Sequence, residues 1–405
     1  MYDILLVSLP EMDKDKPSPA LGFLKAYLNK HGYHIKTIDG NQLNNLSSII
    51  KEIKKHSFKL LGISVFSYEQ KDIALDLGSF FDNVVYGGAG VGTDWPEKDF
   101  IVGEGEEALI QYMEGNKYYP GINGTPPQQL SDISILPPPD YSDLFPNKNY
   151  TSAIISGSRG CVRNCSFCDV ASLWPKYRFL GGATIANYMH EVAEKTGVKS
   201  IGFSDSLVNG SMKHFREMCA ELAKKDKKIK WNGQFIVRAQ NTFSEKDFDN
   251  LKNSGCSGLT IGIESGSEAV RYHMKKKFSN SDLDYFITNL GERNIKMKFL
   301  LIAGYPTETK HDFEQTISMI EKYKKYSHLT EISPHMMLID KNTPLEDDVG
   351  HLYDYFGFYF TNKNSDYNER YRRFKKIFEI GKDNGYGFKK HALDKIEKFN
   401  VQPQS

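Results

Sequence analysis

Short apolar runs alternate with amphipathic stretches through the first 115 residues, and this alternation restricts the fold more than any other feature. Continuous apolar strands separated by helical stretches are typical of a parallel sheet covered by helices on both faces. The sequence predicts strands at 4–9, 33–38, 60–66, 84–86 and 100–102, and helices at 19–30, 46–55 and 71–81. Residues 1–115 are therefore predicted to form a Rossmann-like, doubly wound parallel sheet. Ligands of such sheets bind at the carboxyl ends of the strands.

A second series of strands and helices begins near residue 152. It follows a stretch at 116–150 that is rich in proline and glycine and is predicted to be a linker, because tandem prolines continue neither helix nor sheet. The expected strands lie at 152–157, 199–204, 231–237, 258–263, 297–303 and 330–338, and the expected helices at 184–195, 212–225, 245–253, 281–293 and 310–325. Six such steps predict a partial (β/α)6 barrel of TIM type over residues 151–345. Residues 346–405 are predicted to form a small helical C-terminal cap with helices at 367–380 and 389–398.

Three of the five cysteines lie in one short segment, as Cys161, Cys165 and Cys168 in the spacing C-x3-C-x2-C, directly after the first predicted barrel strand. Three thiolates this close can hold a soft metal centre. A [4Fe–4S] cluster held this way keeps one iron open for a substrate or cofactor. Structural zinc sites and ferredoxin-type runs use four ligands. Cys219 and Cys256 are distant, have no cysteine or histidine at ligand spacing, and are predicted to be structural.

The composition gives no bulk electrostatic signal. The chain of 405 residues has a formal net charge of +1, which does not indicate binding to nucleic acid or to an anionic membrane. No apolar run is long enough to span a bilayer, and Met1–Val7 is interpreted as a strand rather than a signal peptide. We therefore expect a cytoplasmic protein, since a reducing compartment suits free cysteines. The lysine run at 275–277 is predicted to be a solvated helix face.

The cysteine segment, with Phe167 before the third cysteine, resembles the signature of the radical SAM enzymes. Four later segments resemble motifs of the same family in the same order: Ile201–Ser206 on the second strand, Arg238 after the third, Gly262–Ser267 on the fourth and Phe299–Thr309 on the fifth. The resemblance extends over most of the chain and agrees with the barrel predicted above.

This resemblance implies a [4Fe–4S] cluster whose open iron binds the amino and carboxylate groups of S-adenosylmethionine (SAM). The reduced cluster of such enzymes cleaves SAM to methionine and a 5′-deoxyadenosyl radical, which takes a hydrogen atom from the substrate. An electron donor such as flavodoxin or ferredoxin is implied as a partner. The implied SAM contacts are Phe167, Asp205, Arg238, Glu264, Ser265, Ile302 and Gly304. Three have a second interpretation: Asp205 as a helix cap, Arg238 as a surface ion pair and Glu264 as a solvated carboxylate.

The front of the chain resembles a subgroup of the family that has a cobalamin-binding domain before the barrel. The resemblance lies in Phe100–Glu107 and Leu136–Tyr141, and the implied cobalamin contacts are Ser64, Ser67, Gly87, Gly88 and Glu104. Cobalamin domains carry D-x-H-x-x-G after the first strand, and the histidine binds cobalt. The corresponding loop here, Glu11–Lys16, has no histidine, so the resemblance leaves both a cobalamin-bound and a cobalamin-free domain open. The dinucleotide fingerprint G-x-G-x-x-G is also missing there, which argues against NAD.

The predicted function is that of a radical SAM enzyme with an unidentified substrate, with cobalamin-dependent methylation or rearrangement as candidate reactions. One alternative is a radical methylthiotransferase of tRNA or protein. Such enzymes usually carry three more cysteines in the N-terminal domain, and residues 1–150 contain none. The other alternative is a non-enzymatic iron–sulfur electron carrier or sensor, which has no need of the SAM-like strand ends.

Overall fold

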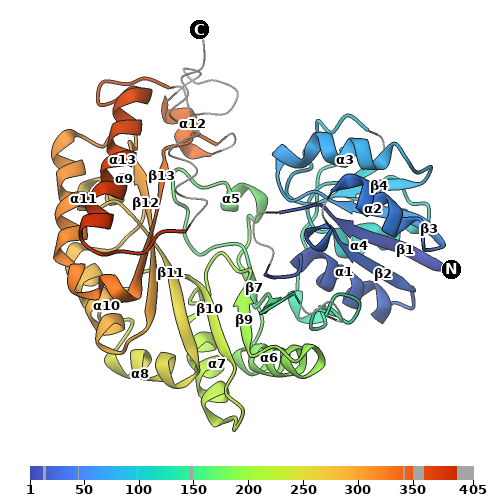
Figure 1. Ribbon diagram of the computed structural model, residues 1–405, viewed down its shortest axis with the longest axis horizontal. Coiled ribbons are helices and arrows are strands. Elements are labelled where there is room, and N and C mark those ends of the chain that lie inside the picture. Colours follow the sequence, from blue (N-terminus) through green and yellow to red (C-terminus); the bar gives the residue numbers. More distant parts are fainter. Residues whose placement is uncertain are drawn as a thin grey trace. The chain divides into compact units, whose positions relative to one another are not determined.

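The structure is a computed structural model that describes residues 1–11, 15–43, 45–97, 99–145, 149–340, 343–349 and 360–389, the last three residues of the 343–349 segment by backbone alone (Figure 1). The chain divides into two compact units, which are described one at a time. The first combines Met1–Gly157 with Arg178–Ser204, and the second combines Ser158–Tyr177 with the chain from Asp205 onward. The domain boundaries at residues 115, 150 and 345 stay a prediction from the sequence.

The first unit contains a five-stranded parallel sheet in the order β2-β1-β3-β4-β5. Its strands are β1 (Tyr2–Ser8), β2 (Ile35–Asp39), β3 (Phe58–Ser64), β4 (Val84–Gly87) and β5 (Phe100–Ile101). The helices are α1 (Pro19–Lys30), α2 (Leu46–Ile53), α3 (Lys71–Gly78) and α4 (Gly105–Met113), with short 3-10 turns η1 (Gly40–Gln42), η2 (Tyr68–Gln70) and η3 (Ile133–Ile135). Helix α1 packs with α4, and α2 packs with α3. The predicted doubly wound sheet is confirmed, and its order reverses between β1 and β3, where such sheets bind ligands.

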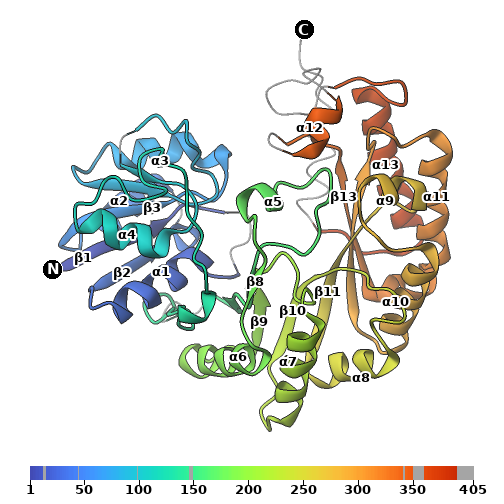
Figure 2. The ribbon, with the colours of Figure 1, turned by 180° about the vertical axis from the view of Figure 1, so that it is seen from behind.

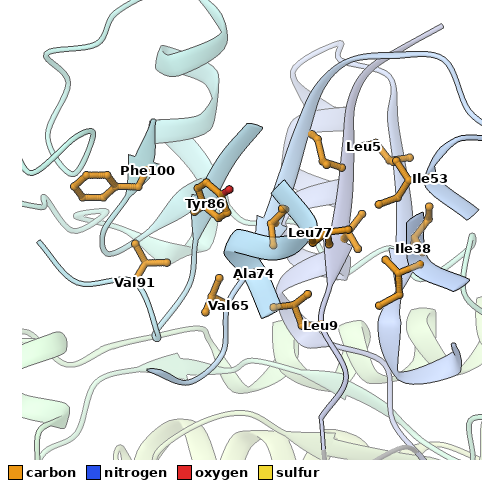
Figure 3. Packing of buried hydrophobic residues seen from close by; sticks show 14 of the residues in the cluster. Leu5, Leu9, Ile38, Ile53, Val65, Ala74, Leu77, Tyr86, Val91 and Phe100 are labelled. Carbon is orange, nitrogen blue, oxygen red and sulfur yellow. The ribbon is translucent and has the colours of Figure 1, made fainter. Parts of the chain in front are cut away.

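Alternate residues of β1 explain how this sheet is covered on both faces. Successive strand residues point to opposite faces. Leu5 and Leu9 lie in one apolar cluster with Ile53 of α2 and with Ala74 and Leu77 of α3 (Figure 3). The residues between them in the sequence are also fully or almost fully buried. Burying each large apolar side chain of this kind contributes about 1.5–3 kcal/mol to folding, so β1 stabilises the packing of helices on the sheet.

The second sheet has six parallel strands in the order β13-β12-β11-β10-β9-β6. Their bounds are β6 (Ala153–Ile155), β9 (Ser200–Phe203), β10 (Lys230–Phe235), β11 (Cys256–Glu264), β12 (Lys296–Ala303) and β13 (Thr330–Met336), and the short strands β7 (Ser158–Arg159) and β8 (Arg178–Phe179) lie apart from it. The helices are α5 (Val170–Leu173), α6 (Gly182–Thr196), α7 (Met212–Lys224), α8 (Glu245–Asn253), α9 (Glu268–His273), α10 (Asn280–Glu292), α11 (Lys310–Lys322), α12 (Pro344–Val349) and α13 (Tyr367–Asp383), with η4 at Lys324–Leu329. Helices follow the strands in turn, as Figures 1 and 2 show, and the predicted partial barrel is confirmed.

Four of the described helices were not predicted: α4, α5, α9 and α12. Helix α4 begins at Gly105, where the sequence was interpreted only as a family motif; Glu106 and Glu107 in its first turn favour the helix start. Helix α9 is one and a half turns long and is capped by Ser267, whose hydroxyl accepts from the Val270 amide. Such short helices leave little periodicity in a sequence. The helix predicted at 389–398 lies outside the described residues, apart from its first position.

Cys219 and Cys256 are buried, as predicted for structural cysteines. All five cysteines lie in described segments and are free thiols. Within the described part of the chain, no helix combines the length and the apolar character that crossing a bilayer would require.

Candidate cluster and SAM site

The cysteine segment lies in the second unit between β7 and α5, and Ser166 anchors it. The buried Ser166 donates its amide to the Met274 carbonyl at 3.3 Å, and its hydroxyl lies 2.8 Å from the Tyr305 hydroxyl. Its carbonyl accepts from the Leu345 amide at 2.8 Å. The Tyr305 hydroxyl is also 2.8 Å from Nδ1 of His273. One residue between two candidate ligands is thus fixed by three separate segments of the barrel.

The three thiols are half-buried and lie near one another. Burial raises the pKa of Cys165, and it raises the pKa of Cys168 to about 11. Each of these thiols also interacts electrostatically with the other cysteines of the segment. Among the described residues, no three His, Cys, Asp or Glu side chains converge on a point suited to one metal ion. A [4Fe–4S] cluster does not need this, because its cysteines bind different irons.

Positive charge surrounds these thiols. Arg163 interacts electrostatically with Cys161 and Cys165, and its amide donates to Sγ of Cys161 at 3.4 Å. Nε of Arg163 is buried and has no hydrogen-bond partner within the described residues. An anionic, thiolate-bound cluster fits this environment, because the guanidinium would otherwise lack a counter-charge.

Glu264 and Lys276 form an ion pair that interacts electrostatically with Cys165. Glu264 ends β11 with a φ of +67°, and its carboxylate lies 2.9 Å from Nζ of Lys276. Their side chains are only 9% and 10% exposed. Nζ of Lys276 is 5.8 Å from the ring centre of Phe167. Burial works to lower the pKa of Lys276, but Glu264 and Cys165 outweigh it and raise the pKa.

The prediction of a solvated lysine run is therefore wrong for Lys276, and so is the interpretation of Glu264 as a solvated carboxylate. Lys275 and Lys277 are exposed as predicted, and both have positive φ, 61° and 56°. This sharp turn directs only the middle lysine into the protein.

Asp205 and Arg238 are placed at strand ends, and the structure removes their simpler interpretations. Helix α7 starts at Met212 after the N-cap Ser211, so Asp205 is not its cap. The Asp205 carboxylate is buried and accepts from the Ser158 hydroxyl at 2.5 Å.

Arg238 is likewise no surface ion pair, because it binds two backbone carbonyls. One terminal nitrogen donates to Asn209 at 2.5 Å and to Gly210 at 2.6 Å. Burial lowers the pKa of Arg238, and Arg163 lowers it further, which places the two guanidiniums near each other. Nε of Arg238 is also buried without a partner among the described residues. Two adjacent guanidiniums suit an anion such as a carboxylate.

Phe167 and Ile302 pack against one apolar cluster although they are 135 positions apart in sequence. Its members come from several elements: Val270, Met274, Tyr305, Met337, Ile339, Leu345 and Phe360. Both side chains are only partly buried, so this cluster supports an apolar surface near the thiols. Such a surface suits the flat face of an adenine.

Ser265 and Gly304 have partners within the protein. Ser265 is fully buried, with its hydroxyl 3.3 Å from that of Thr316 and its carbonyl accepting from Arg271 at 2.7 Å. Gly304 has a φ of +82°, and the Arg370 side chain occupies the place that a Cβ would take. Its conformation is required by packing against this chain, whatever ligand binds.

The predicted cobalamin contacts lie in the first unit, and three of the five are at the ends of neighbouring strands. Ser64 and Gly87 are register partners at the carboxyl ends of β3 and β4. A Cβ on Gly88 would meet the Val65 carbonyl, whereas one on Gly87 would meet nothing closer than 3.7 Å. Ser67 follows in the next loop, and its amide donates to the Gln70 side chain at 3.4 Å.

Glu104 has a structural partner in the same unit. Its buried carboxylate oxygens lie 2.9 and 3.0 Å from a terminal nitrogen of Arg178, and one also accepts from the Leu130 amide. This arrangement fixes the segment before α4.

Comparison with known proteins shows what this chain is similar to. Residues 155–320 match the family model described as the radical SAM superfamily. The chain is 26% identical over 359 residues to an uncharacterized methyltransferase of Pyrococcus horikoshii, covering 79% of this chain and 76% of that one. It is 27% identical to the ribosomal protein uS12 methylthiotransferase RimO of Clostridioides difficile, over 57% of this chain and 53% of that protein.

Two solved structures share the fold. The cobalamin-dependent SAM radical enzyme OxsB, with aqua-cobalamin and SAM bound, matches with a TM-score of 0.70 at 17% identity, over 86% of this chain and 60% of that chain. The radical SAM methyltransferase TsrM of Kitasatospora setae, with cobalamin and a [4Fe–4S] cluster bound, matches with a TM-score of 0.70 at 18% identity, over 86% and 75%. The chain therefore contains a radical SAM domain at residues 155–320. Most of the chain, including the sheet before this domain, shares its fold with OxsB and TsrM.

The sequence analysis assigned no role to three residues of this region: Arg163, Lys276 and Tyr305. Arg163 stands between two candidate ligands, and Tyr305 lies within the motif Phe299–Thr309, so both had a local signal. Lys276 had none, since a lysine in a lysine run is usually exposed.

Proposed function

We propose that this chain cleaves SAM reductively at a [4Fe–4S] cluster and, with cobalamin bound at its first sheet, transfers a methyl group to an organic substrate. The observation that carries the proposal is the set of three half-buried thiols bordered by Arg163, Arg238 and Lys276 at the strand ends of the barrel. The relatives named as methyltransferases support the second part.

The proposed roles follow from the contacts. A bound cluster would supply the electron for reductive cleavage of SAM. Cys161, Cys165 and Cys168 would hold three of its irons. Arg238, oriented by two backbone carbonyls, would pair with the SAM carboxylate. Glu264, held by Lys276, would accept from the ammonium or ribose, and Phe167 and Ile302 would exclude water beside the adenine.

Cobalamin would supply a methyl group carried on cobalt. The residues that fit it are Ser64 and Gly87, side by side at the end of β3 and β4, next to the reversal of strand order. The first loop offers no histidine to cobalt, so affinity would come from the corrin face and the nucleotide tail.

The cluster assignment is tested by comparing Cys165→Ala with Cys256→Ala after anaerobic reconstitution. The wild type and the Cys256 variant should contain about four irons per chain, as a single [4Fe–4S] cluster requires. With dithionite both should form 5′-deoxyadenosine from SAM. Cys165→Ala should lose most of its iron and this product. Full iron and product in Cys165→Ala would show that the ligand set is wrong.

The cobalamin assignment is tested separately by adding hydroxocobalamin to the reconstituted protein and recording the corrin spectrum after gel filtration. Retained corrin supports methyl transfer, which mass analysis of a candidate substrate pool with labelled SAM would then detect. If no corrin stays bound while 5′-deoxyadenosine still forms, the methyltransferase proposal fails and a radical SAM reaction without cobalamin replaces it.

A methylthiotransferase is the second candidate, because RimO matches more than half of the chain. Sulfur transfer of that type usually uses three further N-terminal cysteines, and residues 1–150 have none. Sulfur found in the product would favour this candidate. We further propose a flavodoxin or ferredoxin as the electron donor and a cytoplasmic location, which suits five free thiols.

A further inference from the structure

Helix α13 follows the part of the chain predicted to form the barrel, yet it packs on barrel elements of the same unit. It is capped by Asp366, whose carboxylate accepts from the Glu369 amide at 2.8 Å. Its inner face lies against β12, β13 and α11, and Figures 1 and 2 show it beside these elements. Two arginines on this face, Arg370 and Arg373, are 0% and 2% exposed. Buried arginines are costly unless they are paired, so their partners indicate what the helix does.

Arg373 binds the loop that follows β12. Its Nη1 donates to Oε2 of Glu308 at 2.9 Å and to the Glu308 carbonyl at 2.8 Å. Nη2 donates to the Asn364 carbonyl at 3.2 Å, and Nε to Oε1 of Glu369 at 2.8 Å. The Glu308 side chain is 0% exposed. All three guanidinium nitrogens are therefore used, and the pair is held away from water.

Glu308 connects Arg373 to the backbone at the end of β12. The same oxygen that binds Arg373 accepts from the Gly304 amide at 2.8 Å. The Glu308 amide closes a turn on the Tyr305 carbonyl at 2.8 Å, and the Asn364 side chain donates to the Pro306 carbonyl at 2.8 Å. Gly304 lies two residues after Ile302, which faces the apolar surface beside Phe167.

Arg370 completes the contact from the same helix. Its aliphatic stem lies on the side of Gly304 where any other residue would carry a Cβ. Its guanidinium lies 3.7 Å from the ring centre of Phe360, a member of the cluster that supports Phe167 and Ile302. The residue that follows β12, Gly304, is thus contacted by Arg370 of α13 and by Glu308, which Arg373 of α13 holds.

We propose that Arg373, acting through Glu308, is a positioning residue for SAM, and that α13 is therefore part of the nucleoside side of the SAM site. This inference rests on the proposed function. A buried ion pair adds little net stability over an apolar pair, so its more specific effect is to fix one geometry. Here the fixed geometry is the backbone between Ile302 and Gly304.

The test compares Arg373→Met with Arg372→Met. Arg372 is the adjacent arginine, 58% exposed, and it pairs only with Glu369 among the described residues. Three quantities are measured on reconstituted protein: iron content, the dissociation constant of SAM, and hydrogen exchange of the Gly304 amide without SAM. In Arg373→Met we expect unchanged iron, faster exchange at Gly304 and SAM affinity weakened roughly 5- to 150-fold, the usual range of coupling between sites. In Arg372→Met all three should match the wild type.

A second variant keeps the test decisive if Arg373→Met does not fold. Glu308→Gln preserves the shape of the side chain and removes its charge, and it should also speed exchange at Gly304 and weaken SAM binding. Arg373→Lys should restore part of the affinity lost in Arg373→Met. If SAM affinity is unchanged in both Arg373→Met and Glu308→Gln, with or without faster exchange, the inference is wrong and the proposed function is unaffected. A wild-type protein that keeps its iron but does not bind SAM would instead overturn the proposed function.

Discussion

Lys276 is the residue whose placement differs most from what its surroundings in the sequence indicate. It carries a buried positive charge that interacts with Glu264 and with two of the candidate cluster ligands. A positive charge near a cluster favours the reduced form, because reduction adds an electron. We predict that Lys276→Met lowers the midpoint potential of the cluster and destabilises folding by about 3–5 kcal/mol, since Glu264 loses its partner.

The midpoint potential is measured by redox titration followed with electron paramagnetic resonance, and the folding free energy by urea unfolding. Lys275→Met is the matched control, because Lys275 is exposed one position earlier on the same turn. Equal potentials in the two variants would show that the Lys276 charge does not reach the cluster.

Gly87 and Gly88 are neighbours with different reasons to be glycine. Gly88 has a φ of +117° and lies against the Val65 carbonyl, so the fold requires it. Gly87 has room for a Cβ and an ordinary backbone conformation. We predict that Gly87→Val leaves urea unfolding within about 1 kcal/mol of the wild type, as for a substitution that strains nothing, but abolishes corrin retention by filling the ligand edge. Retained corrin in a folded Gly87→Val protein would place the cobalamin elsewhere.

At the scale of elements, α7 and α8 are joined by a polar contact. Arg216 on α7 donates to both carboxylate oxygens of Asp247 on α8 at 2.8 and 2.9 Å. Asp247 also accepts from Ser244, the N-cap of α8, at 2.9 Å. Burial works to raise the pKa of Asp247, but these donors outweigh it and hold the pKa below its ordinary 3.8.

A depressed folded-state pKa stabilises the protein above the ordinary value, and this stability is lost as the pH falls below it. We therefore predict that Asp247→Asn costs about 1 kcal/mol at pH 7, the scale of a lost cap and a screened ion pair. The difference from the wild type should shrink as the pH falls below 3.8. Urea unfolding across pH measures it, with Asp249→Asn, 59% exposed on the same helix, as the control.

The sequence predicted most elements because their signals are local. The strands of both sheets are apolar runs, and α1 and α11 begin at the residues where their caps or prolines indicate. Helix α9 and the pairing of Lys276 with Glu264 were not predictable in this way. Helix α9 is too short to show a period, and the ion pair depends on a backbone turn with positive φ and on a partner twelve positions away. The Glu308–Arg373 contact joins residues 65 positions apart, and no local pattern encodes it.

At the scale of the whole chain, the first unit is assembled from two stretches of sequence. Arg178, in the second stretch, pairs with Glu104 in the first, and both side chains are less than a tenth exposed. We predict that Arg178→Met destabilises this unit by about 3–5 kcal/mol, since it strands a buried carboxylate. Urea unfolding provides the measurement. Lys195→Met removes an exposed ion pair within a helix instead and should change the free energy of unfolding little. Equal losses of stability in the two variants would show that the buried pair contributes no more than the exposed one.

The division of the first unit has a consequence for synthesis on the ribosome. Its second stretch begins at Arg178, after all three cysteines of the segment between β7 and α5. Domains generally fold as units while the chain emerges from the N-terminus. The nascent first unit therefore cannot close until Cys161, Cys165 and Cys168 have already left the exit tunnel. These cysteines are thus exposed on a nascent chain whose β12 end and α13, more than a hundred residues downstream, have yet to be made.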